Sequence, residues 1–341
     1  MARLTALSGL GRKSAALFLL EIEGRRLLLD MGGGLEAGER PDLSQAGRVD
    51  AVLLSHAHVD HVGALDRLAE IGNPPVYATQ ETQRQLTSNL RPPRLAKLPD
   101  RGCAEVLGVR LDTGRSGHAP GGIWMHFATL RGGLLYTGDF STEAPLLRCD
   151  PFPRSATVLA DASYGDREDS LADQIAALTE AARGGAVLPC PLGGRGPDMV
   201  AALGAAGLTV HACPQIADET ERLTGTPPPV ATPETATPAQ IIVADGPNAE
   251  HGLCAALRER PGFRFIFSGH VPRSSPAHAM LAEGHARWMG WNVHPRLSDI
   301  LAMAETTRAE RVLPAFVDLR AAPRLTAALG PRLRQCPSLE V

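Results

Sequence analysis

Short apolar runs separated by turn residues recur along the first part of the chain and predict buried strands. Residues 14–22 are strand-like, residues 23–24 give a turn signal, and residues 26–29 form a second apolar run. Residues 51–54 form another run, of the length expected for a buried strand. The pattern predicts a hairpin and a further strand beyond it.

Helical character then alternates with strands. Residues 63–71 are predicted to be helical and residues 75–79 to form the next strand, which is the βαβ rhythm of an α/β fold. Later apolar runs at residues 134–136 and 157–160 predict two more strands. The first part of the chain is therefore expected to be an α/β layer.

A second α/β layer is predicted to be inserted into the first, over residues 166–285. An amphipathic helix at residues 171–182 precedes a strand at 186–188, and buried-strand runs follow at 241–243 and 265–268. The alternation of elements thus starts again within this segment.

The expected organisation is a divided domain with an insertion. Residues 1–165 and 286–341 form the two parts of the first domain, and the insertion lies between them. Length alone is compatible with two domains or with one elaborated domain.

Candidate chemistry gathers directly after the strand predicted at residues 51–54. His56 and His58 stand at alternate positions, so their imidazoles can turn the same way toward one ion. Asp60 and His61 lie beyond them and can serve a second ion close by, because neutral imidazole and carboxylate oxygen suit zinc and its neighbours. A polar loop with coincidental histidines is the alternative, and four ligand-type side chains in six positions weigh against it.

Composition changes the picture in a few respects. The net charge is -3 and aromatic residues make up 4% of the chain, so it lacks the basic excess and the wide aromatic platform of proteins that coat nucleic acid. Basic stretches at residues 84–101 and 308–334 leave a local basic groove open, although ordinary solvated faces explain them equally well.

The cysteines and the N-terminal residues indicate a reducing compartment. Six scattered cysteines show no Cys-x-x-Cys spacing, so reduced thiols are expected. The apolar run at residues 15–20 is too short for a signal sequence or a membrane span. The expectation is a soluble cytoplasmic protein without a membrane partner.

The order His-x-His-x-Asp-His at residues 56–61 resembles the signature of the metallo-β-lactamase superfamily. Later motifs fit the same family. Asp30 ends an apolar strand, and in the family an aspartate at this position supports the metal ligands through hydrogen bonds. His118 lies in a glycine-rich loop and Asp139 ends a strand, as the third and fourth motifs require.

The resemblance implies a two-metal site. His118 would complete the first site with His56 and His58, and Asp139 would bridge both ions. The implied metal ligands are His56, His58, Asp60, His61, His118 and Asp139.

Two further motifs resemble those of β-CASP nucleases, the group that includes mRNA 3′-end-processing factors, RNase J and Artemis-like proteins. Asp161 begins a segment similar to their Glu-Ser-Thr-Tyr-Gly motif, and His294 lies in one similar to Ser-x-His-x-Asp. Glycine-rich turns at residues 193–196 and 269–275 resemble family loops, which makes Arg195 and Arg273 candidate phosphate contacts. A plain turn is the alternative reading for both loops.

The resemblance implies an αββα metallo-β-lactamase sandwich with an inserted, shortened α/β β-CASP cap. It also implies hydrolysis of phosphodiesters in RNA or DNA by a metal-activated water. His294, oriented by Asp161, would be the general acid, and Asp60 would also be catalytic. Zn²⁺ is the expected metal, and Mn²⁺ is an alternative.

One position departs from the family pattern. Where the final motif has histidine, this chain has Phe316, and DNA-directed members of the group carry an apolar valine there. The second ion is therefore expected to be weak beside one tight ion, unless a nearby group such as Asp318 replaces the missing ligand.

Two other functions remain open at this point. A metallo-β-lactamase-fold hydrolase of a small ester or thioester would not need Asp161, His294 or an inserted cap. A non-catalytic nucleic-acid-binding scaffold would not need the six ligands. The sequence does not distinguish RNA from DNA or endonuclease from exonuclease action, and it leaves the oligomeric state open.

Overall fold

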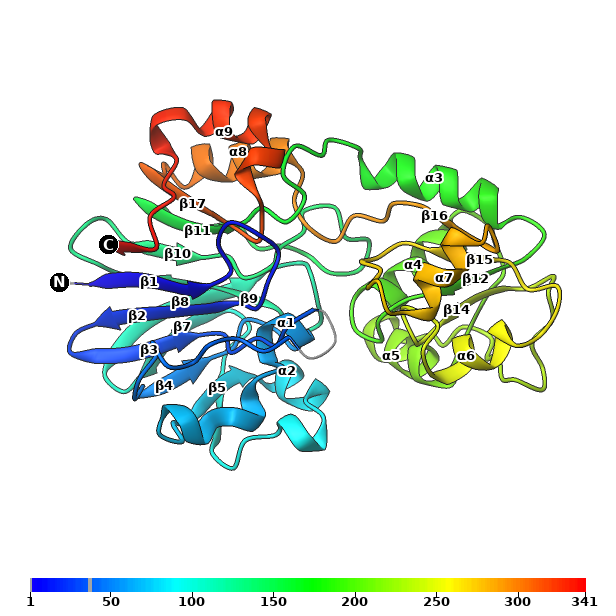
Figure 1. Ribbon diagram of the computed structural model, residues 1–341, viewed down its shortest axis with the longest axis horizontal. Coiled ribbons are helices and arrows are strands. Elements are labelled where there is room, and N and C mark those ends of the chain that lie inside the picture. Colours follow the sequence, from blue (N-terminus) through cyan, green and yellow to red (C-terminus); the bar gives the residue numbers. More distant parts are fainter. Residues whose placement is uncertain (1, 36–38) are drawn as a thin grey trace. The chain divides into compact units, whose positions relative to one another are not determined.

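The computed structural model describes residues 2–35 and 39–341, and its chain divides into two compact units (Figure 1). The first unit consists of Met1–Thr142, Arg148–Glu168 and His294–Val341. The second consists of Glu143–Leu147 and Asp169–Val293. The inserted unit thus runs from residue 169 to 293, beside the expected 166 to 285, and also takes in a short segment that precedes it.

The first unit contains two sheets. In spatial order, the seven-stranded sheet is formed by β18 (Ser338–Glu340), β1 (Arg3–Ser8), β2 (Leu17–Ile22), β3 (Arg25–Leu29), β4 (Ala51–Leu53), β5 (Val76–Thr79) and β6 (Leu95–Leu98). The six-stranded sheet is formed by β17 (Arg311–Ala315), β11 (Thr157–Asp161), β10 (Leu134–Tyr136), β9 (Ile123–Phe127), β8 (Val109–Arg115) and β7 (Gly102–Val106).

Alternating side chains of the central strands enter two different cores, which explains their continuous apolar runs. In β2, Phe18 and Leu20 belong to the cluster shared by both sheets, whereas Leu17 and Leu19 belong to the cluster on the outer face. In β11, Leu159 likewise joins the shared cluster and its neighbours join the other face. Successive side chains of a strand point to opposite faces, so a strand buried on both sides must be apolar throughout.

Helices cover the outer faces of both sheets. The seven-stranded sheet carries α1 (Val59–Val62), the 3₁₀ helices η1 (Leu65–Ile71) and η2 (Ser88–Leu90), and α2 (Gln80–Gln85). The six-stranded sheet carries α8 (Leu297–Thr306), α9 (Pro323–Leu329), η3 (Leu319–Ala321) and η4 (Gly330–Arg332). This arrangement is the αββα sandwich that the family resemblance implied, and the segment predicted to be helical at residues 63–71 contains a kinked 3₁₀ helix at residues 65–71.

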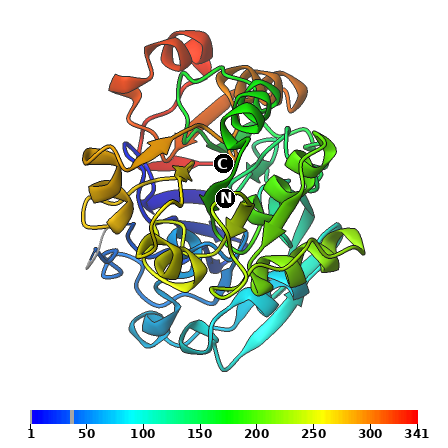
Figure 2. The ribbon, with the colours of Figure 1, turned by 90° about the vertical axis from the view of Figure 1, so that its right-hand side faces the viewer.

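The second unit is a parallel α/β layer (Figure 2). Its sheet has the order β13 (Val210–Ala212), β14 (Ile241–Ala244), β12 (Ala186–Pro189), β15 (Phe265–Phe267) and β16 (Ala286–Trp288). Its helices are α3 (Leu171–Ala182), α4 (Arg195–Ala205), α5 (Pro214–Thr224), α6 (Gly252–Arg258) and α7 (Pro276–Ala282). The start of α3 follows from its cap, because the Ser170 side chain accepts a hydrogen bond from the backbone of Asp173.

None of the helices in the described residues combines the length and the apolar character needed to cross a membrane.

Candidate active site

The candidate site lies in the first unit, where strands of both sheets end. Asp30 follows β3, and the histidine cluster begins two residues after Leu54, beyond β4. Asp139 comes shortly after β10, and Asp161 is the last residue of β11. Neighbouring parallel strands bring their carboxyl ends to the same edge of a sheet, so these side chains converge although they are far apart in sequence.

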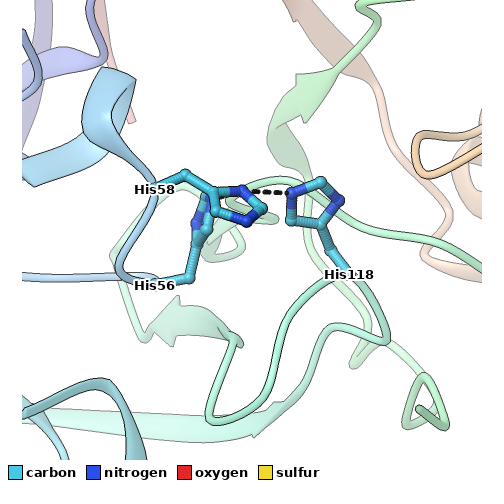
Figure 3. A group of neighbouring side chains, drawn as sticks. All are labelled: His56, His58 and His118. Carbon is cyan, nitrogen blue, oxygen red and sulfur yellow. Dashed lines mark hydrogen bonds between the residues drawn. The ribbon is translucent and has the colours of Figure 1, made fainter. Parts of the chain in front are cut away.

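Three histidines form the first group (Figure 3). The ligand nitrogens of His56, His58 and His118 lie within 4.8 Å of one another. The Nδ1 atom of His58 is 3.1 Å from Nε2 of His56 and 2.9 Å from Nε2 of His118. Three imidazole nitrogens that converge on one point are a donor set typical of zinc.

A second group shares one member with the first and contains His56, His61 and Asp139. The Nε2 atom of His61 lies 3.3 Å from Oδ1 of Asp139, and Nε2 of His56 lies 3.9 Å from Oδ2 of the same carboxylate. A third group contains His118, Asp139 and His294. Asp139 therefore lies between the histidines, where its two oxygens face different groups.

Buried polar atoms of these residues fit a cation. The Nε2 atoms of His58 and His61 and Oδ1 of Asp139 are buried without a hydrogen-bond partner among the described residues. Buried polar atoms without a partner are rare because each costs free energy. A divalent ion in the group of His56, His61 and Asp139 would satisfy the atoms of His61 and Asp139, so these residues fit the metal implied by the sequence.

The protonation of two of these histidines also suits metal binding, whereas Asp139 and Asp30 outweigh burial at His61 and raise its pKa well above the ordinary value. Burial lowers the pKa of His58 to about 4, against the opposing attraction of Asp60 and Asp139. Burial also lowers the pKa of His56 well below its ordinary value. Both imidazoles are therefore neutral at pH 7, and the neutral form is the one that binds a metal.

Asp30 holds His61 in place. Its Oδ2 atom is 2.7 Å from Nδ1 of His61, and the same carboxylate accepts hydrogen bonds from the Tyr136 hydroxyl and from the backbone and side chain of Ser55. With Nδ1 engaged by Asp30, Nε2 of His61 faces Asp139. Asp30 itself has a left-handed backbone, with φ of 60°.

Asp161 and His294 form a close pair although 133 residues separate them. The Oδ2 atom of Asp161 lies 2.8 Å from Nδ1 of His294, and Asp161 also accepts hydrogen bonds from the backbone of Phe140 and of Ser163. The His294 ring is 4.8 Å from the His118 ring, centroid to centroid. An acid–base residue thus lies beside the metal-binding groups.

The second nitrogen of His294 faces a residue that the sequence analysis passed over. The Nζ atom of Lys13 lies 3.2 Å from Nε2 of His294. Lys13 belongs to the glycine-rich loop before β2, which resembles an ordinary turn. A basic residue directly before a buried strand was the available signal, but nothing local connects it with position 294.

Asp60 is buried in α1 and belongs to none of the three groups found among the described residues. Its carboxylate does influence the site, because its charge opposes the effect of burial on His58 and acts on Lys13. Its role as a metal ligand and catalytic residue stays a prediction.

Phe316 is buried directly after β17, and its ring centroid is 5.5 Å from that of His61. It therefore lies beside a ligand of the second group without offering a donor atom. Asp318, the alternative donor, caps η3 and pairs with the exposed Arg320. It belongs to none of the candidate metal groups in the described part of the chain.

The two candidate phosphate contacts lie in the second unit. Arg195 begins α4, and its guanidinium lies against Gly269. Arg273 is exposed between β15 and α7. A role in binding phosphate stays a prediction for both.

The chain is similar to two ribonucleases and to a transcription termination factor. Ribonuclease TTHA0252 of Thermus thermophilus is 34% identical over 175 residues, which are 44% of this chain and 41% of that protein. Transcription termination factor FttA of Methanothermobacter thermautotrophicus is 30% identical over 49% of this chain and 32% of its own length. Ribonuclease J2 of Bacillus subtilis is 27% identical over 43% of this chain and 30% of its own. The chain thus matches less than half the length of each.

A solved structure and a family model extend the comparison. A crystal structure of a protein of unknown function from Enterococcus faecalis has a TM-score of 0.64 and 13% identity, and the match covers 93% of this chain and 94% of that one. This likeness concerns the fold alone. The model of the metallo-beta-lactamase superfamily matches residues 10–181, half of the sequence, and so confirms what the histidine motif indicated: the chain belongs to the metallo-β-lactamase superfamily.

Proposed function

We propose that this protein is a metal-dependent nuclease that hydrolyses phosphodiester bonds of nucleic acid, with RNA as the first substrate to examine. The observation that carries the proposal is the pairing of His294 with Asp161 beside the two candidate metal groups that share His56. A leaving alkoxide needs a proton, and an imidazole held by a carboxylate next to a metal site can supply one.

The metal in this proposal is zinc, with manganese as an alternative. His56, His58 and His118 hold the tight ion, and His61 and Asp139, with Asp60, hold a weaker one. When bound, such ions lower the pKa of a water molecule toward neutrality and offset the charge that develops on the phosphate oxygens. The protein residues orient these ligands, as Asp30 does for His61.

His294 has the geometry of a general acid. Its Nδ1 faces Asp161 at 2.8 Å, which leaves Nε2 to carry a proton toward the leaving 3′ oxygen. The carboxylate fixes the orientation of the ring and stabilises the imidazolium form. Cleavage of the bond to the 3′ oxygen leaves a 5′ phosphate on the product.

The relatives support a nucleic-acid substrate. Two of the proteins named above are ribonucleases and another is a transcription termination factor. Because this chain corresponds to 41% or less of each, its substrate is part of the proposal.

Two rival functions make different demands. A hydrolase of small esters has no use for an acid positioned by a carboxylate 133 residues away. A binding scaffold has no use for buried imidazole and carboxylate atoms without partners, since those atoms only destabilise a protein that lacks the metal.

A digestion panel tests the proposal. Purified protein is incubated with Zn²⁺ or Mn²⁺ and with end-labelled RNA and DNA, single- and double-stranded, and a thioester substrate is assayed alongside. We expect cleavage of RNA that produces 5′-phosphate ends and that stops on chelation. Hydrolysis of the thioester with no nucleic acid cleaved would favour the small-ester hydrolase, and metal binding without any hydrolysis would favour the scaffold.

A further inference from the structure

Lys13 brings a positive charge to the general acid of the proposed nuclease. The loop between β1 and β2 carries it, and its Nζ atom lies 3.2 Å from Nε2 of His294. That nitrogen is the one not engaged by Asp161, whose carboxylate faces Nδ1. Lys13 therefore lies where a substrate must approach if His294 is to protonate it.

The contact between these two side chains has a defined direction. An ammonium group has only hydrogen atoms to offer, so Lys13 donates and Nε2 of His294 accepts. The remaining ring hydrogen then lies on Nδ1 and is donated to Asp161. In this arrangement Lys13 occupies the position that a leaving oxygen would take.

The surroundings of Lys13 keep it charged. Burial lowers the pKa of its ammonium group, but attraction by Asp60, Asp139 and Asp161 outweighs burial and raises the pKa above its ordinary value. A lysine presents its charge as a single point on a flexible stem, so it can exchange one partner for another. The Lys13 residue as a whole is exposed to solvent, which gives the stem room to move.

We propose that Lys13 is a catalytic residue that binds a non-bridging oxygen of the scissile phosphodiester and gives up its contact with His294 when the substrate enters. The proposal rests on the nuclease function above. The ammonium keeps its proton throughout, so the exchange forms and breaks only hydrogen bonds. Its consequence is that Nε2 of His294, which no longer accepts from Lys13, is free to take up a proton from solvent and then give it to the leaving oxygen.

The same contact would select the class of substrate. A phosphodiester carries a negative charge on its non-bridging oxygens, whereas an ester or thioester is neutral at the reacting carbon. A fixed cation beside the acid therefore favours the phosphodiester in the ground state and still more as charge accumulates.

Variants of two neighbouring residues test the proposal. K13M keeps most of the side chain and removes the charge, K13A removes both, and K13R restores a charge. The matched control is R12A, because Arg12 lies in the same loop but is exposed and pairs with Glu39 at 3.1 Å. Each holoenzyme is assayed on an RNA oligonucleotide that the wild type cleaves, and its bound metal is quantified.

We expect K13M and K13A to lower kcat/KM by about 10²-fold, as loss of one donor to a developing anion does, with metal content unchanged. K13R should recover part of the rate, and R12A should behave as wild type. In a plot of the logarithm of binding affinity against the logarithm of salt concentration, the slope for K13M and K13A should be smaller in magnitude than that of the wild type by about 0.7. This is the value for one phosphate contact on a single strand. A phosphorothioate at the scissile linkage should shrink the K13M defect for one diastereomer only.

Several outcomes would overturn the assignment. Cleavage by K13M at the wild-type rate would show that the charge of Lys13 is not needed. Loss of metal or of folding in both K13M and K13A would show that Lys13 has a structural role. Tighter metal binding at unchanged turnover would show that Lys13 only balances the carboxylates. If the wild type cleaves no nucleic acid, the proposed function itself fails, whereas an active wild type with an unaffected K13M removes Lys13 alone.

Discussion

The two units of the molecule differ in the side chains that follow the carboxyl ends of their strands. In the first unit, histidines and aspartates follow the carboxyl ends of strands. In the second unit the corresponding positions hold Cys190 after β12, Cys213 after β13 and Asp245 after β14. All three candidate metal groups among the described residues belong to the first unit. The ends of parallel strands therefore bring side chains together in both units, but only in the first unit are these side chains the histidines and aspartates of the candidate metal groups found among the described residues.

Burial keeps side chains of both sets uncharged. It raises the pKa of the Cys190 thiol and so keeps it protonated and uncharged, as suits a core residue. In the first unit, buried atoms of His58, His61 and Asp139 have no hydrogen-bond partner among the described residues. Because the three candidate metal groups of the described residues all lie in the first unit, we expect stability to depend on a metal ion there.

The largest effect is expected from removing a ligand of the first group. H58A should lose most of its bound metal and its activity, because even a supporting partner of a ligand is worth roughly 10- to 100-fold in affinity. Metal analysis and turnover measure this. H278A, which removes an exposed histidine of α7, is the control. Stoichiometric metal and full activity in H58A would show that this group is not the metal site.

The next largest effect separates the acid from the metal. H294A and D161A should cut turnover by roughly 10²- to 10⁴-fold, the typical value of a positioned general acid, and leave metal content nearly intact. D161N, which keeps an oxygen acceptor, should retain the fold and lose most of the rate. Wild-type cleavage of a phosphodiester by H294A or D161A would contradict the mechanism.

A smaller effect is expected at Phe316. Its backbone is left-handed, with φ of 64°, and histidine accepts that conformation more readily than most residues do. F316H should therefore fold and add a donor beside His61, which tightens the second ion by about 10- to 100-fold. Titration of Zn²⁺ into metal-stripped protein measures both sites, and F316L controls for loss of the ring. Two equally tight sites in the native protein would refute the prediction.

The smallest effect concerns stability and lies in the second unit. Burial raises the pKa of Asp198 in α4 to about 7, although the backbone N–H of Leu146 opposes it. The folded state then holds a proton that the unfolded state has released, so stability falls as the pH rises from about 4 to about 7. A shift from 3.8 to about 7, at about 1.4 kcal/mol per pKa unit, sets an upper limit of roughly 4 kcal/mol. We expect a loss of about 1 to 2 kcal/mol, because an ionised carboxylate draws in water.

Replacing Asp198 tests that expectation. D198N keeps the acceptor for Leu146 and removes the titrating carboxyl group. Its free energy of unfolding in urea should therefore lose this pH dependence, and at pH 8 it should be larger than that of the wild type. The transition is followed with metal bound, so that the first unit does not change between samples. Parallel pH profiles for D198N and the wild type would contradict the prediction.

Local patterns in the sequence predicted individual strands and helices well, whereas the sandwich was implied by the family resemblance. Strands such as β2 and β11 are apolar throughout because both of their faces are buried, and periodicity reveals this directly. Helix α3 begins and ends at the predicted residues, because Ser170 and the apolar spacing mark it locally. The histidine spacing at residues 56–61 likewise needs no long-range information.

Features that depend on tertiary contacts were less accessible. The approach of Lys13 to His294 joins residues 281 positions apart, and nothing in either segment indicates it. The separation of Asp60 from the three metal groups depends on how α1 turns after His58. The short segment Glu143–Leu147 joins the second unit partly because Asp198 accepts a hydrogen bond from it, which no periodicity reveals.

The division of the first unit also has a consequence for biosynthesis. All members of the first two metal groups are translated before residue 140, but His294 follows the entire second unit. Strand β17, which pairs with β11 beside Asp161, is translated later still. Because domains form in order as the chain leaves the ribosome, a nascent chain would hold metal ligands long before it holds its acid. If the chain is the nuclease proposed above, it would lack its general acid until the whole second unit has been translated.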